Sequence, residues 1–409
     1  MFDEISSGTD FQMSLLLMVA LGGYILAARI HQSAVIGEIL LGVLIGPSLL
    51  GWVDYTSLVE HLAELGAVVL LFVIGLEFKV KEVYQWKYAP IALAGVIVPW
   101  VSGYLLAKMY GYSSDTSIFV GTALTATSIA ITATVLAEMK KLDTPAAKAI
   151  IGAAVIDDVL GLLFLSFSEG MAEGGVSAIS MFGMASKAIL FLVGGTIFGL
   201  LILSRIMNWI DKSYMAIRYP EFCFVSSMMM CFLYATVAEA VGLSAIVGAF
   251  VAGISLERVH LMNSMSCTAG ADYLRIIFGA IFFVSLGILV DLTTIDLRII
   301  GFLVLLIALA IASKIIGCAG SARCLGYNKN DSMVIGVGMV PRGEVAMIVA
   351  LVGLEQGLIG KDIYAAIILM SLLTTIFAPL ILTNFLYKQG DTAEPANHSN
   401  GCECSKSGR

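Results

Sequence analysis

Residues 151–161 read IGAAVIDDVLG and place two adjacent carboxylates, Asp157 and Asp158, within the apolar run Pro145–Leu165. A run of about 20 residues is long enough for a helix to cross the hydrocarbon core of a bilayer. An ionised carboxylate at that depth is costly unless it is paired, hydrated or protonated. An acidic pair at a helix end would be ordinary, but here apolar residues continue past the pair on both sides. Consecutive helical residues point about 100° apart, so the aspartates cannot share one partner. We therefore interpret the pair as a functional site, in which one carboxylate meets a cation from another helix and the other faces a water-filled cavity.

The composition defines the class of protein around this site. Of 409 residues, 59% are hydrophobic and only 13% are charged, and the mean hydropathy is +0.95. These values are far too apolar for a soluble domain and predict an all-α integral membrane protein in contact with the lipid bilayer. The net charge of −7 comes without a basic patch, so we expect no nucleic-acid partner. No strand followed by a G-x-G-x-x-G fingerprint is found, and we expect no cofactor.

Hydrophobic stretches divided by short polar breaks predict about 13 transmembrane helices. The stretches are residues 11–29, 34–52, 61–78, 88–108, 116–138, 144–168, 182–206, 219–239, 242–256, 272–290, 297–321, 331–355 and 361–387. Alternate breaks are rich in Lys and Arg, whereas the others are mostly acidic. Because basic loops stay in the cytoplasm, we expect a multi-pass protein of the cell (inner or plasma) membrane with its N-terminus outside and its C-terminus inside. The polar tail after the last helix is expected to be disordered.

Two of the predicted helices look interrupted. Residues 122–134 read TALTATSIAITAT, and residues 337–344 read VGMVPRGE. Pro and nearby Gly break the helical hydrogen-bond ladder, and Ser and Thr hydroxyls can satisfy the freed backbone groups. These segments lie in the fifth and twelfth helices, which correspond if two six-helix units flank a seventh connecting helix. The arrangement predicts two inverted six-helix repeats with two crossing broken helices and an ion site at the crossing.

A few further ionisable residues are expected inside the membrane. Lys314 needs an anionic partner, for which Asp157 or Asp158 is the obvious choice; the alternative is that it snorkels toward the cytoplasmic surface. Arg342 and Glu344 are expected to neutralise each other in part and to cap the broken helix ends.

Two further glutamates, Glu77 and Glu38, fit more than one role. Glu77 stands beside Lys79 and Lys81 in the sequence GLEFKVK, which favours an interfacial role at an inner helix end. Glu38 fits either a gate or a packing contact to a neighbouring serine, and the sequence leaves both open.

The predicted crossing also offers ligands for an ion. Half-helix ends bring partial charges of both signs to the bilayer centre. Freed carbonyls and the hydroxyls of Thr127, Ser128 and Thr132 are hard oxygen ligands. One carboxylate with neutral oxygens suits a small monovalent cation, since Mg²⁺ or Ca²⁺ usually takes more carboxylates.

Taken together, these motifs resemble the cation/proton antiporter-2 family of monovalent cation/proton antiporters, in its prokaryotic sodium/proton form. The residues that carry the resemblance are Val35–Pro47 (VIGEILLGVLIGP), Gly75–Phe78 (GLEF), Thr125–Thr132 (TATSIAIT), Gly152–Leu162 (GAAVIDDVLGL), Phe282–Gly287 (FFVSLG), Lys314 and Gly338–Glu344 (GMVPRGE). The chain departs from the pattern at Thr134, where many relatives carry an arginine.

The resemblance implies a homodimer in which a core domain moves like an elevator against a dimerisation scaffold. Asp158 would carry the proton or the Na⁺ ion, which makes it the metal ligand. Asp157 would pair with Lys314, and the Thr127, Ser128 and Thr132 side chains would line the site. The implied division is 1–109 scaffold with its fourth helix in the core, 110–170 core, 171–215 linker helix, 216–292 scaffold, 293–388 core and 389–409 cytoplasmic tail.

The resulting hypothesis is a secondary active transporter, and not an enzyme, that exchanges Na⁺ or Li⁺ for H⁺ by alternating access. Exchange is electrogenic if Lys314 also releases a proton. K⁺/H⁺ exchange is the nearest alternative, and a proton-conducting channel is another. An intramembrane aspartyl protease is disfavoured, because adjacent aspartates diverge instead of converging on one water and a G-x-G-D motif is missing.

Overall fold

A computed structural model of the chain describes residues 9–53, 55–83, 85–172, 178–214, 218–219, 221–256, 265–290 and 299–387. Within these ranges every regular element is a helix, which confirms the all-α prediction. The tail predicted for 389–409 lies outside the described residues. The first elements are α2 (Thr9–Arg29), α3 (Ala34–Ile45), α4 (Ser57–Leu76), α5 (Val80–Val83), the 3-10 turn η1 (Trp86–Tyr88) and α6 (Ala89–Met109).

The middle of the chain contains one broken helix and one long composite helix. The bounds are α7 (Ser114–Ala123), α8 (Ile129–Glu138), α9 (Pro145–Ala172), α10 (Ala178–Leu190), η2 (Phe191–Gly195), α11 (Thr196–Phe198), η3 (Gly199–Leu203), α12 (Ser204–Asp211), α14 (Glu221–Ala240), α15 (Ala245–Ser255) and α16 (Met265–Ile288). Elements η2 and η3 are π-helical turns through which α10 continues into α12.

The last third contains the second broken helix. Its elements are α17 (Ile300–Lys314), the π-helical turn η6 (Ile315–Ala319), α18 (Gly320–Cys324), α19 (Lys329–Gly338), α20 (Glu344–Glu355), α21 (Lys361–Ile381) and the π-helical turn η7 (Leu382–Leu386).

Each of the 13 predicted stretches overlaps one helix or a run of consecutive helices, but the stretch predicted over 34–52 is helical only as far as Ile45, where α3 ends. By length and hydropathy, seven spans in the described part of the chain could cross a membrane unaided. They are Thr9–Arg29, Ser57–Leu76, Val80–Met109, Phe182–Asp211, Glu221–Ala240, Ile300–Cys324 and Lys361–Leu386. The count of 13 crossings and the inverted repeat remain predictions, because the broken helices supply only short apolar segments.

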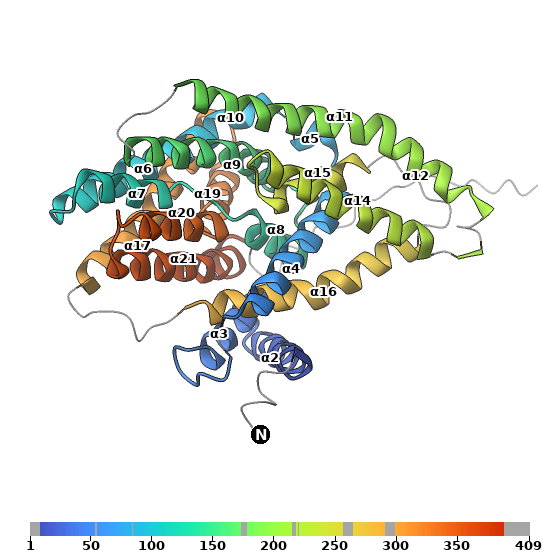
Figure 1. The fold of residues 1–409 in the computed structure, drawn as a ribbon, viewed down its shortest axis with the longest axis horizontal. Helices are drawn as coiled ribbons and strands as arrows, with labels where there is room; N and C mark the ends of the chain where they lie inside the picture. The colour runs from blue at the N-terminus through green and yellow to red at the C-terminus, as the bar shows by residue number, and fades with distance from the viewer. Residues whose placement is uncertain are drawn as a thin grey trace, which may run out of the picture.

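One set of helices packs through glycines, and we call α2, α3, α4, α14, α15 and α16 the glycine-packed group. These helices contact one another in a chain of pairs and lie in the lower and right part of Figure 1. A Cβ on Gly37 of α3 would overlap the carbonyl oxygen of Gly23 on α2. The same holds for Gly287 of α16 against Ile39 of α3, and for Gly253 of α15 against Phe72 of α4. Since lipid offers no hydrophobic drive between helices, such close backbone contact is what holds membrane helices together.

A second set surrounds the two broken helices, and we call α6, α7, α9, α17, α19, α20 and α21 the crossing group. Segments far apart in sequence meet here, since α7 packs on α20 and α6 packs on α17. Figure 1 shows α7, α17, α20 and α21 gathered on the left of the molecule. Helix α8 lies between the sets, because it contacts α9 and α21 on one side and α3 and α4 on the other.

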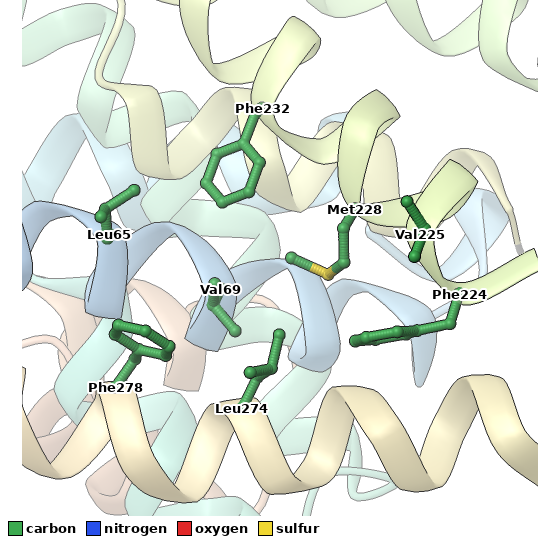
Figure 2. Close-up of a pocket in the computed structure, with 8 residues that line it drawn as sticks. All are labelled: Leu65, Val69, Phe224, Val225, Met228, Phe232, Leu274 and Phe278. Atoms are coloured by element: carbon green, nitrogen blue, oxygen red, sulfur yellow. The ribbon is translucent and has the colours of Figure 1, made fainter. Parts of the chain in front are cut away.

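An apolar groove lies within the glycine-packed group, between α4, α14 and α16 (Figure 2). Its volume is about 320 Å³, and its walls include Val69, Met228 and Phe278. None of the predicted site residues lines it. The groove is therefore separate from the aspartate pair.

Candidate functional site

Both helices that the sequence predicts to be interrupted are broken, and their unwound segments touch. Helix α7 ends at Ala123 and α8 begins at Ile129, whereas α19 ends at Gly338 and α20 begins at Glu344. The backbone N–H of Ser128 donates to the carbonyl oxygen of Pro341 at 2.9 Å. Breaking a helix orphans backbone groups, and this bond satisfies one from each segment.

Side chains fasten the crossing further. The Thr132 hydroxyl, on the first turn of α8, donates to the carbonyl oxygen of Gly338 at 2.6 Å. Gly343 lets the segments approach, because a Cβ there would lie 2.7 Å from Oγ of Ser128. Ser128 is buried, and its hydroxyl has no hydrogen-bond partner among the described residues. The two predicted ligands Thr132 and Ser128 therefore differ, since one hydroxyl is occupied by the backbone and the other is not.

Arg342 is fully buried and donates hydrogen bonds to backbone carbonyl groups at the broken helix. Its Nη1 donates to the carbonyl oxygens of Thr125, at 3.4 Å, and Ala126, and its Nη2 donates to that of Ala310 on α17 at 3.4 Å. These carbonyls include two that the break in α7 and α8 leaves without helical donors. The capping role predicted for Arg342 agrees with these contacts. The side chain of Glu344 lies outside the description, so the predicted Arg342–Glu344 ion pair stays a prediction.

A lysine and an aspartate form a fully buried ion pair in the crossing group. Nζ of Lys314 lies 3.1 Å from Oδ1 of Asp157, and the two side chains are 0% and 1% exposed. Lys314 therefore does not snorkel. Removing either partner would leave an uncompensated charge in a medium of low dielectric constant, where such a loss costs about 3–5 kcal/mol.

Asp158 lies one residue further along α9 and is only partly buried. It differs from Asp157 in exposure, as expected for neighbours that point in different directions on one helix. The Thr127 hydroxyl lies within hydrogen-bonding reach of Asp157 and is 3.5 Å from the carbonyl oxygen of Met339. The structure thus brings the aspartates, the lysine and the unwound threonine segment together at one place.

The two accessory glutamates lie apart from this place. Glu77 is exposed and follows the last residue of α4, which agrees with an interfacial location. Glu38 is 7% exposed on α3, which contacts α8.

Sequence reasoning missed several residues that shape the site. Gly95 on α6 leaves room for the lysine, because a Cβ there would lie 3.3 Å from Nζ of Lys314. The π-helical turn η6 begins directly after Lys314, and π turns are frequent at functional sites. Trp100 donates to Oγ1 of Thr122 at 3.2 Å, and that hydroxyl meets Oγ of Ser168 on α9 at 2.7 Å. A glycine and a tryptophan in an apolar helix carry no separate sequence signal, which explains the omission.

In chemical terms, the arrangement offers a partly exposed carboxylate beside a neutralised one. A proton or a small cation can bind Asp158 while Lys314 balances Asp157. No group of three or more His, Cys, Asp or Glu side chains gathers to hold a resident metal ion in the described ranges.

Comparison with known proteins identifies the family. The profile of the sodium/hydrogen exchanger, transmembrane family matches residues 16–388. This chain belongs to that family.

Individual relatives agree over nearly the whole length. The Na(+)/H(+)-K(+) antiporter GerN of Bacillus cereus is 32% identical over 374 residues, covering 91% of this chain and 95% of GerN. The Na(+)/H(+) antiporter of Enterococcus hirae is 30% identical over 383 residues, covering 92% and 97% of the two chains. The resemblance to cation/proton antiporters that the motifs indicate is thereby confirmed.

A solved structure shares the fold. The sodium proton antiporter MjNhaP1 from Methanocaldococcus jannaschii at pH 8 superposes with a TM-score of 0.66 at 18% identity, covering 91% of this chain and 95% of that one. At this identity the likeness concerns the fold alone.

Proposed function

We propose that this protein exchanges Na⁺ for H⁺ across the membrane by alternating access, with Asp158 as the carrier of either ion. The observation that carries the proposal is the buried Lys314–Asp157 pair beside a partly exposed Asp158, at the contact of two unwound segments. Because Asp157 is already paired with Lys314, Asp158 is the carboxylate that can exchange a bound proton for a bound Na⁺ ion.

Competition at Asp158 couples the two fluxes. A carboxylate that holds a proton has lost the charge that binds Na⁺, and one that holds Na⁺ repels the proton. Thr127 and Ser128 would complete the cation shell with hydroxyl oxygens, and Thr132 would do so through the lone pairs left after its bond to Gly338. Lys314 would give up a second proton when the cation draws Asp157 away, which makes exchange electrogenic.

Movement of the crossing group against the glycine-packed group would expose the site to each side in turn. The proposal includes a homodimer that forms through the scaffold, an outside N-terminus and a cytoplasmic C-terminus. The dense glycine contacts support a rigid scaffold, because close backbone packing leaves little room for sliding. The helix run from α10 to α12 would link the two halves.

Potassium is a second candidate substrate. The relative GerN is described as an Na(+)/H(+)-K(+) antiporter, so K⁺ is a reasonable ion to test for this chain. Neutral oxygens with one carboxylate favour hard monovalent cations without choosing strongly among them.

The test is ion exchange in proteoliposomes loaded with a pH-sensitive dye. We expect Na⁺ and Li⁺ to drive H⁺ movement in the wild type, and an imposed membrane potential to change the rate if exchange is electrogenic. Asp158→Asn should reduce exchange to the level of empty liposomes. Asp143→Asn makes the same change at an exposed carboxylate before α9 and should behave as the wild type. Sodium-driven exchange that survives Asp158→Asn would remove the proposal.

A further inference from the structure

A series of hydrogen bonds joins three helices of the crossing group beside the first break, and we call Trp100, Thr122 and Ser168 the Trp100 network. The indole N–H of Trp100 on α6 donates to Oγ1 of Thr122 on α7 at 3.2 Å. The Ser168 hydroxyl on α9 donates to the carbonyl oxygen of Phe164 at 2.7 Å, so Thr122 is the donor in its own 2.7 Å contact with Ser168. Thr122 and Ser168 are 0% and 1% exposed. Each of these two hydroxyls receives one hydrogen bond and donates one, as a buried hydroxyl requires.

The indole of Trp100 is held in place by its surroundings. It stacks on Tyr104 of its own helix, with ring centroids 5.5 Å apart. Its ring also lies 5.7 Å from that of Phe164 and 6.4 Å from that of Phe167, both on α9. Gly121 makes room for it on α7, because a Cβ there would lie 2.8 Å from the carbonyl oxygen of Trp100 and 3.4 Å from Nε1. The direction of the N–H is therefore fixed, and α6, α7 and α9 are joined at one point.

The threonine of this network also holds the start of the unwound segment. Thr122 is the second-last residue of α7, and its carbonyl oxygen accepts the backbone N–H of Thr125 at 3.0 Å and the Thr125 hydroxyl at 2.8 Å. The carbonyl oxygen of Thr125 lies 3.4 Å from Nη1 of Arg342. Thr127 and Ser128, the proposed cation ligands, follow within three residues. The bonds of Thr122 thus fix where the backbone leaves α7 on its way to these ligands.

In the proposed function, on which this inference rests, the cation binds between the unwound segment and Asp158 of α9. A protein selects among cations of equal charge by the size of the site, the number of ligands and how firmly they are held. The Trp100 network ties the segment that carries the hydroxyl ligands to the helix that carries Asp158. We propose that Trp100, Thr122 and Ser168 are positioning residues that set the width of the cation site and thereby determine the preference among monovalent cations.

The expected effect of breaking the network has a fixed direction. Without it, the unwound segment can move away from α9, which widens the site. A wider site favours a larger ion, so K⁺ gains over Na⁺ and Na⁺ gains over Li⁺, whichever ion the wild type prefers. The ratio of the apparent KM for K⁺ to that for Na⁺ should fall by about threefold to tenfold, since the loss of one neutral hydrogen bond shifts an equilibrium by such a factor.

The experiment measures H⁺ exchange driven by Na⁺ and by K⁺ in proteoliposomes, over a range of cation concentrations and on one preparation of each variant. Trp100→Phe removes the N–H but keeps an aromatic ring, whereas Ser168→Ala and Thr122→Val remove the hydroxyls. All three should lower the KM ratio, and Thr122→Ser, which keeps the hydroxyl, should keep the wild-type ratio. If the wild type does not exchange K⁺, the ratio of the KM for Li⁺ to that for Na⁺ is measured, and it should rise. A loss of folded protein lowers the rate with every ion alike, so a merely structural defect leaves the ratio unchanged.

Two control variants make matched changes outside the network. Trp209→Phe changes an indole that is 73% exposed on α12. Thr134→Val removes a buried hydroxyl that donates to the carbonyl oxygen of Ala130 in its own helix, at 2.7 Å. Both variants should keep the wild-type KM ratio, because neither change touches the link between α7 and α9.

The outcomes separate the two hypotheses. Wild-type liposomes that exchange no monovalent cation for H⁺ would overturn the proposed function. Wild-type exchange with an unchanged KM ratio in Trp100→Phe, Thr122→Val and Ser168→Ala would overturn the role of the network alone. If a folded variant no longer exchanges ions, its melting temperature in increasing Na⁺ or K⁺ decides, because a bound cation stabilises the folded protein. Stabilisation by the two ions in the wild-type proportion would then contradict the proposal, and a shift toward K⁺ would support it.

Discussion

The glycine-packed group and the crossing group hold their helices together differently, although close glycine contacts such as that of Gly121 on α7 with Trp100 on α6 also occur in the crossing group. In the first, helices approach until their backbones touch, as at Gly37 and Gly287. In the second, two helices are unwound and the lost hydrogen bonds are replaced by Arg342 and Thr132. Backbone contact resists motion because any shift creates overlap, whereas a polar crossing can exchange partners. In the mechanism that we propose, the first group would stay fixed while the polar contacts of the second change partners.

Charge distinguishes the two groups as well. The crossing group buries Lys314, Asp157 and Arg342 completely. Among the described side chains of the glycine-packed group, the buried carboxyl is Glu38, on α3, which contacts α8. These four buried charges thus lie at the border between the groups or beside the broken helices.

The largest effect is expected from breaking the deepest ion pair. Lys314→Ala leaves Asp157 buried without its cation, and the loss should destabilise the protein by about 3–5 kcal/mol. Thermal unfolding in detergent measures this. The double variant Asp157→Asn with Lys314→Met should recover most of the loss, since no charge is then stranded.

An exposed ion pair provides the matched control. Lys148 lies 3.0 Å from Glu82, but the two side chains are 23% and 29% exposed. Lys148→Ala should therefore cost less than about 1 kcal/mol. Equal losses for Lys314→Ala and Lys148→Ala would contradict the view that the crossing group depends on a dehydrated charge pair.

A smaller effect is expected from disturbing the backbone contacts. Gly287→Ala places a Cβ against the carbonyl of Ile39, and overpacking of this kind costs about 1–3 kcal/mol. Gly183→Ala on α10 meets nothing within 4 Å and should be neutral or slightly stabilising, because Ala is the better helix former. The same thermal unfolding assay applies to both. If the Gly287→Ala and Gly183→Ala proteins have the same melting temperature, the close contact at Gly287 does not contribute measurably to the stability of the protein.

Much of this arrangement could be predicted from the sequence because it depends on residues that are unusual in membrane helices, namely charged side chains and helix breakers. Two aspartates and a lysine in apolar helices must find partners, and the Asp157–Lys314 contact is observed. Pro341 with its neighbouring glycines marks the second break, and the Thr-rich segment marks the first.

What the sequence did not reveal depends on partners far along the chain. Glu138 stood at the end of a predicted helix, where a charge is ordinary, and its bond to Ser33 joins residues 105 positions apart. Gly95 makes room for Lys314 only because α6 happens to pack on α17 and η6. Such contacts leave no local pattern, so periodicity and composition could not find them.

The smallest loss of stability is expected from removing a single hydroxyl group at the crossing. Thr132→Val keeps the shape of the side chain but removes the donor to the carbonyl of Gly338, which should cost about 1 kcal/mol. Thr236→Val makes the same change on α14, where the hydroxyl only donates to Phe232 of its own helix and is exposed. Because that carbonyl keeps its helical partner, Thr236→Val should leave the melting temperature nearly unchanged. If the Thr132→Val and Thr236→Val proteins have the same melting temperature, the crossing is held by its backbone hydrogen bond and by Arg342. The Thr132 hydroxyl would then be available to a bound cation.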